Sequence, residues 1–327
     1  MFTRQVYTGE TAMTKSEPRV VTTREAIRTA VLDARGRGKS VGLVPTMGAL
    51  HEGHLSLVRA AAAECDVAVV TVFVNPSQFA PGEDFERYPR DLDADLRLLA
   101  REGVNLVFAP PTEEMYRPEH AVTVEPGPVA EPWEGACRPG HFRGVATIVL
   151  KLFHAAPADV AFFGHKDYQQ SLVVRRMVED LDVPIRIRVC PTLREAGGLA
   201  LSSRNAYLSG EQRSRALGLS HGLRAAREMF AAGERGGPAI VERMFQSLEA
   251  ASVDRVDYAT VADPQTLEAA ETADERSVAL IAAHVGHTRL IDNHVLGEPF
   301  PVEEATPATP VLCDTKKLGL SKSAGTR

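Results

Sequence analysis

The sequence predicts an α/β fold built on a parallel β-sheet with helices on both faces. The run at 41–44 is continuously apolar and the run at 67–74 contains no breaker, as is typical of strands buried in a parallel sheet. Segments with apolar residues at helical spacing follow them, so that a β-α-β-α-β order is reached by residue 108. Clusters of polar residues follow several strands, at the sheet edge where such folds bind ligands.

The first large unit is expected to span residues 19–191, after a flexible extension over 1–18. Alternation of apolar runs and helical periodicity predicts strands at 41–44, 67–74, 104–108, 160–163 and 185–189. The same criterion predicts helices at 55–63, 91–102, 144–155 and 168–181. The turn-rich segment 112–140 is interpreted as a small sheet excursion or a flexible cover.

A smaller α+β unit is expected over residues 192–298, where it would act as a lid. Ser209-Gly210-Glu211-Gln212 is a capping box that predicts a helix running to Phe230. A second helix is predicted at 238–251, followed by strands at 256–261, 278–284 and 288–291. The remaining segment, 299–327, is rich in Pro, Thr and Lys and is predicted to be disordered.

Composition excludes several functional classes. The chain has 327 residues and a formal net charge of −6, which does not favour general nucleic-acid binding. No apolar run approaches the ~20 residues that cross a bilayer, and residues 1–17 lack the apolar core of a secretory signal. The four cysteines are scattered, which predicts neither disulfides nor a zinc site. We therefore expect a cytoplasmic protein without membrane or nucleic-acid partners.

The chain is organised around Pro45–His54, which lies between a strand and a helix. Unpaired N–H groups and the positive dipole end of a helix start favour phosphate binding. His51 and His54 are three residues apart, so both imidazoles would lie on one side of the first turn. Two imidazoles can donate hydrogen bonds to charge that develops on a reacting phosphate. A helix-capping or surface role is the alternative for these histidines.

Three further polar stretches carry candidate site residues. Asn75 and Gln78 follow the second strand and either shape a turn or bind hydroxyl and carboxylate groups of a substrate. Lys166 and Asp167 are either a helix-start pair or ligands for phosphate and for ribose or metal.

Two further groups of candidate residues lie at the start of a helix and at the start of the second unit. Gln169 and Gln170 point to different faces of their helix, so at most one of them faces the ligand crevice. The sequence Ser202-Ser203-Arg204 is either a capped turn or a mobile clamp for a triphosphate.

Five blocks together resemble the pantothenate synthetase (pantoate–β-alanine ligase) family, of the HxGH adenylyl-transferring, Rossmann-like superfamily. They are PTMGALHEGH, TVFVNPSQF, HFRGVATIVLKLF, FFGHKDYQQ and LREAGGLALSSRN, in this order. The resemblance covers about residues 20–295. It implies a Rossmann-like domain for ATP and pantoate over 19–191, and a homodimer.

The resemblance also implies the reaction and the residues that carry it. The reaction would condense (R)-pantoate with β-alanine through a pantoyl adenylate, releasing AMP and pyrophosphate. The catalytic residues would be His54 as general acid, His51, Lys166 and Arg204. The ATP site would comprise Met47, Gly48, Ala49, Leu50, His51, Glu52, Gly53, His54, Gly164, His165, Lys166, Asp167, Leu193, Leu201, Ser202, Ser203 and Arg204. Gln78, Gln170 and Asn75 would bind pantoate, with Gln78 also near β-alanine.

Three positions depart from the family pattern. Leu201 replaces a Met that usually begins the clamp, which conserves volume. His165 stands where an acidic residue or Gln is common. Asp93 and Asp95 lie where some members hold Mg²⁺, but alternate residues of a helix do not face each other. We therefore assign no protein metal ligand and expect Mg²⁺ mainly on the ATP phosphates.

Three alternative functions fit these residues less well. A nucleotidylyltransferase acting on a phosphate acceptor would need more cationic groups than Gln78 and Gln170 provide. An aminoacyl-tRNA synthetase of class I is disfavoured by the acidic balance and the lack of an anticodon-binding extension. A regulatory protein that binds nucleotide without turnover is disfavoured by the intact histidines, Lys166 and Arg204.

Overall fold

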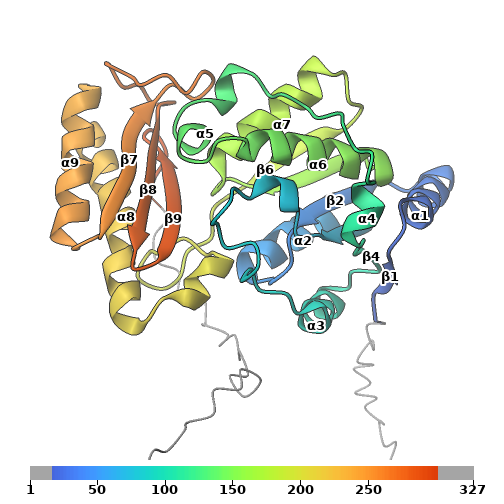
Figure 1. Ribbon diagram of the computed structural model, residues 1–327. Coiled ribbons are helices and arrows are strands. Elements are labelled where there is room, and N and C mark those ends of the chain that lie inside the picture. Colours follow the sequence, from blue (N-terminus) through green and yellow to red (C-terminus); the bar gives the residue numbers. More distant parts are fainter. Residues whose placement is uncertain (1–16, 301–327) are drawn as a thin grey trace, which may run out of the picture.

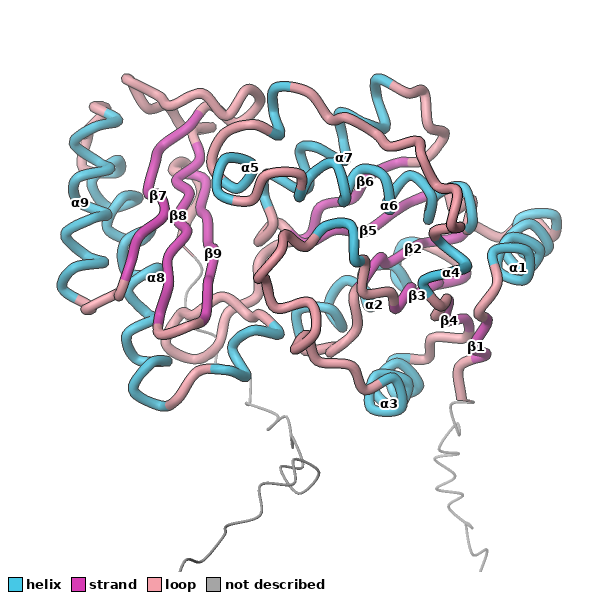
Figure 2. The backbone as a smooth tube through the Cα atoms, in the orientation of Figure 1, coloured by secondary structure: helices cyan, strands magenta, loops and turns pink. Residues whose placement is uncertain are grey.

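The computed structural model describes residues 17–300 (Figure 1). The extension predicted for 1–18 lies outside the described residues except for Glu17 and Pro18. The tail predicted for 299–327 also lies outside them, except for Pro299 and Phe300, and Phe300 packs against His294. Two separate sheets organise the described chain (Figure 2).

The larger sheet has six parallel strands in the order β1-β4-β3-β2-β5-β6. These are β1 Arg19–Val21, β2 Val41–Thr46, β3 Val67–Val72, β4 Leu106–Phe108, β5 Val160–Gly164 and β6 Arg186–Cys190. From β2 the chain builds outward to one side and then returns to build from β5 on the other. The carboxyl ends of β2 and β5 therefore form the point where strand order reverses, at which open α/β sheets leave a ligand crevice.

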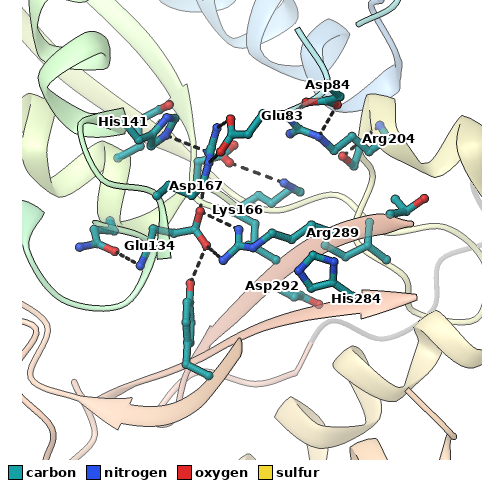
Figure 3. A pocket seen from close by; sticks show the side chains of 18 of the residues that line it. Glu83, Asp84, Glu134, His141, Lys166, Asp167, Arg204, His284, Arg289 and Asp292 are labelled. Atoms are coloured by element: carbon teal, nitrogen blue, oxygen red, sulfur yellow. Dashed lines mark hydrogen bonds and ion pairs between the residues drawn. The ribbon is translucent and has the colours of Figure 1, made fainter. Parts of the chain in front are cut away.

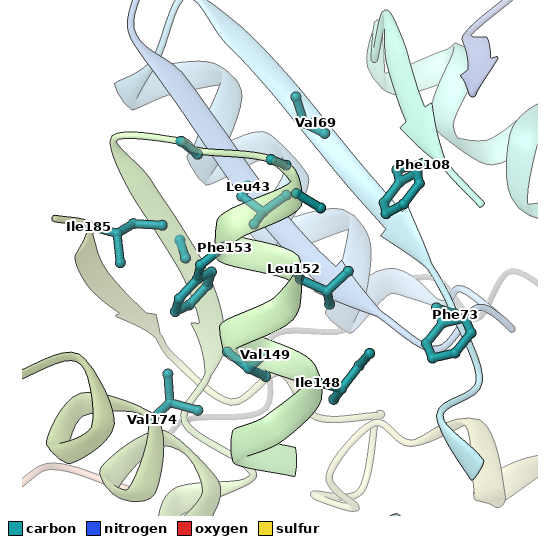
Figure 4. Close-up of a cluster of buried hydrophobic side chains, with 14 of the residues drawn as sticks. Leu43, Val69, Phe73, Phe108, Ile148, Val149, Leu152, Phe153, Val174 and Ile185 are labelled. Carbon is teal, nitrogen blue, oxygen red and sulfur yellow. The ribbon is translucent and has the colours of Figure 1, made fainter. Parts of the chain in front are cut away.

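Helices cover both faces of this sheet, as predicted. One face packs against α1 (Arg24–Gly36), α6 (His141–Ala155) and α7 (Tyr168–Asp180), and the other against α2 (Glu52–Glu64) and α3 (Leu92–Glu102). Alternation along each strand supplies both cores: Leu43 and Phe163 belong to the first, and Val44 and Phe162 to the second. Figure 4 shows Leu43 and Val69 facing Leu152 and Phe153 of α6.

The smaller sheet is antiparallel, in the order β7-β8-β9, which confirms the predicted α+β character of the second unit. Its strands are β7 Arg255–Ala262, β8 Val278–Val285 and β9 Thr288–Val295. The helices α8 (Gly210–Ala231) and α9 (Gly237–Ala250) pack on its outer face, away from the larger sheet (Figure 1). The division at residues 191–192 stays a prediction.

Two features differ from the sequence-based expectation. Strand β1 was missed, because three residues are too few to show a period. The segment 112–140 contains no strand, so the sheet excursion was wrong. It forms the short helices α4 (Thr112–Met115) and α5 (Glu134–Cys137) and the 3₁₀ turn η2 (Pro128–Ala130). Its prolines, at 118, 126, 128, 132 and 139, lack the N–H that a strand ladder requires.

Two features of residues 17–300 bear on membranes and on disulfides. No helix of this part of the chain is long and apolar enough to cross a membrane. Its three cysteines, Cys65, Cys137 and Cys190, are free thiols.

Candidate active site

Two adjoining cavities lie at the carboxyl edge of the larger sheet, beside the second unit. The smaller has a volume of ≈ 210 Å³ and the larger ≈ 550 Å³. They share five lining residues: Lys166, Asp167, Gln170, Ser202 and Arg204. The smaller cavity brings together most predicted site residues, namely Met47, His51, Gly53, His54, Asn75, Gln78, Gly164, Lys166, Asp167, Gln170, Leu193, Leu201, Ser202, Ser203 and Arg204.

The two histidines cap the start of α2. His51 is the N-cap residue, and its Nδ1 accepts a hydrogen bond from the Gly53 N–H at 3.1 Å. His54 is at the third helical position, and its Nδ1 accepts from the His51 N–H at 3.3 Å. The ring centroids are 4.1 Å apart, which confirms that both lie on one side of the first turn. The capping and functional interpretations are therefore compatible, since capping uses only Nδ1.

These hydrogen bonds fix the protonation of both rings. An Nδ1 that accepts from a backbone N–H leaves the ring proton on Nε2. Burial, the neighbouring His54 and Lys166 lower the pKa of His51 to about 2. Burial also lowers the pKa of His54 to about 4, against the opposing charge of Asp167. At neutral pH the cavity therefore contains two neutral imidazoles, each with an Nε2–H to donate.

The turn between β2 and α2 is held by Asp95 of α3. Its carboxylate accepts from the N–H groups of Ala49 (3.1 Å) and Leu50 (2.7 Å). Gly48 has φ +80°, and a Cβ there would lie 2.9 Å from Asp95 Oδ2, so the close approach requires glycine. Burial raises the pKa of Asp95 to about 6. Asp95 binds this turn and Asp93 is exposed; that neither is a metal ligand stays a prediction.

Gln78, a candidate for binding hydroxyl and carboxylate groups, has its side-chain amide held by neighbouring residues. Its Oε1 accepts from Asn75 Nδ2 at 3.0 Å, and its Nε2 lies 3.1 Å from Met47 Sδ. Asn75 is almost fully buried and also bonds the Gly144 carbonyl and the Tyr116 hydroxyl. Asn75 therefore both borders the cavity, as predicted, and shapes the turn that presents Gln78.

The main chain of Gln78 is held from the start of α6. Its carbonyl oxygen contacts His141 Nδ1 at 2.8 Å and Arg138 Nη2 at 3.4 Å. Arg138 also forms a two-pronged ion pair with Glu83, with both distances 2.7 Å. Burial lowers the pKa of His141 to about 4, so this ring is neutral and donates from Nδ1. Arg138 and His141 line the larger cavity, so they connect this cavity to the main chain of Gln78.

The segment after β5 divides its residues between two surfaces. Lys166 and Asp167 face the cavities, with Nζ and Oδ1 3.6 Å apart. Gln170 lines both cavities, whereas Gln169 is buried, borders only the larger one and binds the carbonyls of Val129 and Pro132 through its amide. Gln170 is therefore the one glutamine of this pair that reaches the smaller cavity beside the histidines, in line with the prediction that the two point to different faces.

The predicted clamp closes against the α2 turn. Ser203 Oγ donates to the Ala49 carbonyl at 3.2 Å, and the Leu201 N–H donates to the Leu193 carbonyl at 2.9 Å. Arg204 is paired with Asp84, through Nε to Oδ2 at 3.0 Å and Nη2 to Oδ1 at 2.9 Å (Figure 3). Leu201 lines the cavity, and its tolerance in place of Met stays a prediction.

Five predicted residues do not line either cavity. Gly48, Ala49 and Leu50 form the turn, and Glu52 pairs with Arg59 on the surface. His165 packs edge-on against Tyr168, and its carbonyl accepts from Asn293 of β9. Burial lowers the pKa of His165, so the extra titratable group we expected near phosphate is a neutral ring facing the second unit.

Sequence reasoning missed three residues that shape the site, Asp84, Arg138 and His141, and it also missed the contact of Asp95 with the turn. Arg138 and His141 lie at the edge of the block HFRGVATIVLKLF, which was interpreted only through its apolar face. The available signal was Arg138 and His141, which flank Pro139-Gly140 where the amphipathic helix begins. Asp84 has no such signal, because its partner lies 120 residues away.

Together these groups suit the activation of a carboxylate by a nucleoside triphosphate. The helix start, the two Nε2–H groups, Lys166 and Arg204 can neutralise phosphate charge. The paired amides of Gln78 and Gln170 can bind hydroxyl and carboxylate oxygens without adding charge.

Known proteins show the same organisation. A family model described as pantoate-beta-alanine ligase matches residues 19–295. The pantothenate synthetase of Roseiflexus sp. (strain RS-1) is 54% identical over 278 residues, covering 85% of this chain and 99% of that protein. That of Moorella thermoacetica is 52% identical over 271 residues, covering 83% and 96%.

Solved structures agree with these sequence relatives. The crystal structure of pantothenate synthetase from Thermus thermophilus matches with a TM-score of 0.81 and 46% identity, covering 86% of this chain and all of that one. A pantoate-beta-alanine ligase from Francisella tularensis, complexed with beta-gamma ATP and beta-alanine, matches with a TM-score of 0.73 and 30% identity. The match covers 87% of this chain and all of the Francisella chain.

Proposed function

The chain belongs to the pantoate–β-alanine ligase family, whose ATP-dependent reaction condenses pantoate with β-alanine, and we propose that the two adjoining cavities carry out its two steps. The smaller cavity binds ATP and pantoate, and the larger one admits the amine. The observation that carries this assignment is the neutral histidine pair at the start of α2, which lines the same cavity as Gln78 and Gln170.

In the first step, a carboxylate oxygen of (R)-pantoate attacks the α-phosphorus of ATP. The bond from the α-phosphorus to the bridging oxygen breaks, and pyrophosphate leaves with the electron pair. Two anions must approach one another, so positive and dipolar groups have to offset their repulsion. The N–H groups at the α2 start, Nε2–H of His51 and His54, Lys166 and Arg204 supply these groups.

In the second step, the β-alanine amine attacks the acyl carbon of pantoyl adenylate. A C–N bond forms, the acyl C–O bond breaks, and AMP departs with that oxygen while the amine loses a proton. His54, which the family resemblance makes the general acid, acts here mainly as a hydrogen-bond donor, because its pKa of about 4 keeps the free ring neutral. Phosphate charge beside the ring favours its protonated form.

Gln78 and Gln170 hold the hydroxyl and carboxylate groups of pantoate. Asn75 Nδ2 donates to Gln78 Oε1 and Met47 Sδ accepts one N–H of Gln78 Nε2, which leaves the second N–H of that amide for a pantoate oxygen. Both glutamines are uncharged, whereas a phosphate acceptor would favour cationic groups at these positions, which disfavours the nucleotidylyltransferase alternative. Leu201–Arg204 and the rest of the second unit shield the reactive anhydride from water.

Three further properties extend this proposal. Mg²⁺ enters bound to the ATP phosphates, and residues 17–300 include no group of three or more His, Cys, Asp or Glu that could hold a metal ion. The enzyme acts as a homodimer, as the family resemblance implies. It works in the cytoplasm, where free thiols such as those of Cys65 and Cys190 persist.

The test is AMP release from ATP, with pantoate and β-alanine omitted in turn. We expect AMP only when both are present, and pantoate-dependent exchange of pyrophosphate into ATP without β-alanine. AMP formation that needs neither substrate, or no AMP at all, would contradict the proposal.

A further inference from the structure

The loop over residues 80–90, between η1 (Pro76–Gln78) and α3, places two neighbouring carboxylates against two arginines. Glu83 pairs with Arg138, beside the Gln78 main chain, and Asp84 pairs with Arg204 of the clamp. All four residues line the larger cavity, and Figure 3 shows Glu83 beside the pair of Asp84 and Arg204. The loop is also tied to the second unit by the Tyr207 hydroxyl, which donates to the Arg87 carbonyl at 3.1 Å.

The Asp84 pair uses only one edge of the Arg204 guanidinium. The carboxylate accepts from Nε and from one N–H of Nη2, a side-on arrangement. A guanidinium has five N–H donors, so the end formed by Nη1 and the second Nη2 N–H remains. Within residues 17–300 this end makes no hydrogen bond, and Arg204 lines both cavities. The arginine can therefore bind Asp84 and a phosphate at the same time.

Both partners are held tightly enough to fix an orientation. Their side chains are 28% and 16% exposed, and the Tyr88 ring lies over the guanidinium, 6.0 Å from centroid to carbon. Burial opposes ionisation of Asp84, but the hydrogen bonds and charge of Arg204 outweigh it and lower the pKa of this carboxyl. Arginine has a long side chain, and ordering it on binding a phosphate costs conformational entropy. The charged, two-pronged pair with Asp84 already orders this side chain before the phosphate binds, so less entropy is lost at that point.

We infer that Asp84 is a positioning residue for nucleotide binding: it holds Arg204 side-on, so that the free end of the guanidinium is preorganised for the triphosphate. The inference rests on the phosphate-binding role proposed for Arg204. The opposite role, in which the carboxylate competes with phosphate for the arginine, predicts the reverse change in affinity.

The experiment compares Asp84→Asn with Glu86→Gln, an exposed change of the same charge in the same loop. The affinity for a non-hydrolysable ATP analogue is measured by calorimetry, and the KM values for ATP and pantoate by pyrophosphate exchange. We expect Asp84→Asn to weaken analogue binding and raise the KM for ATP about tenfold, with the KM for pantoate unchanged. Glu86→Gln should match the wild type, and Asp84→Glu should recover part of the loss.

Arg204→Gln and the double variant with Asp84→Asn separate positioning from a merely structural effect. If Asp84 acts through Arg204, adding Asp84→Asn to Arg204→Gln should not weaken the analogue further. Unchanged or tighter analogue binding by Asp84→Asn, or an equal loss in the Arg204→Gln background, would overturn the inference. Analogue binding needs no turnover, so this experiment tests the role of Asp84 even if the wild type forms no AMP. A wild type that forms no AMP would instead contradict the proposed function.

Discussion

A methyl group added at Gly144 should displace Gln78, which we propose binds pantoate. A Cβ built there lies 2.3 Å from the Ser77 carbonyl oxygen and 2.7 Å from Gln78 Cα. Ordinary contact begins at 3.4 Å, so helix α6 and the 76–78 turn must separate by about 1 Å. The same movement lengthens the 3.2 Å bond from Asn75 Nδ2 to the Gly144 carbonyl.

The expected cost follows from this geometry. A misplacement of about 1 Å can reduce a rate about 10²-fold, so kcat/KM for pantoate in Gly144→Ala should fall by about that factor. Overpacking should also lower the free energy of unfolding by about 1–3 kcal/mol. The KM for ATP should change much less, because the three atoms nearest to a Cβ at Gly144 belong to Ser77 and Gln78 rather than to the α2 turn.

Steady-state kinetics with each substrate varied, together with urea denaturation, would check this prediction. Gly36→Ala is the matched control, since a Cβ at Gly36 meets nothing within 4 Å. A Gly144→Ala enzyme with wild-type kcat/KM for pantoate would refute the link between the α6 contact and Gln78.

Three further predictions concern other parts of the site. His54→Ala should slow adenylate formation about 10²-fold or more in single-turnover assays, whereas the exposed His221→Ala should not; wild-type turnover would exclude the role of His54. Burial raises the pKa of Asp95 from 3.8 to about 6, so its stabilising contribution is fully present below pH 3.8 and is lost as pH rises through 6. Asp95→Asn should reduce the difference in the free energy of unfolding between pH 5 and pH 7.5, measured by denaturant titration. An unaltered difference would argue against the raised pKa of Asp95. Glu134, 7% exposed, binds Arg289 and Tyr258 across the two units, so Glu134→Gln should cost about 3 kcal/mol and the exposed Glu131→Gln almost nothing.

The larger sheet was predictable because its strands are local and uninterrupted. Val67–Val72 is β-branched and lies at the sheet centre, and the polar residues after β2 and β5 meet because parallel strands end at one edge. Strand β1 pairs with β4, 87 residues further along at Arg19 and Leu106, and no local signal announces such a pairing.

The candidate site was predictable in position but not in its hydrogen bonding. The sequence places His51 and His54 at a helix start, whereas their neutral state depends on backbone N–H groups and on burial. Arg204 was expected to bind phosphate, and its carboxylate partner could not be foreseen, because Asp84 lies in an irregular loop 120 residues away. Such contacts come from tertiary packing, which local patterns do not encode.

The central claim is that pantoate is activated by attack on the α-phosphorus of ATP. It is tested most directly with pantoate whose carboxylate carries ¹⁸O, followed by mass analysis of the products. Attack on the α-phosphorus predicts one labelled oxygen in the phosphate of AMP, because aminolysis breaks the acyl C–O bond. Label in inorganic phosphate with release of ADP, or no label in any phosphate product, would contradict the account.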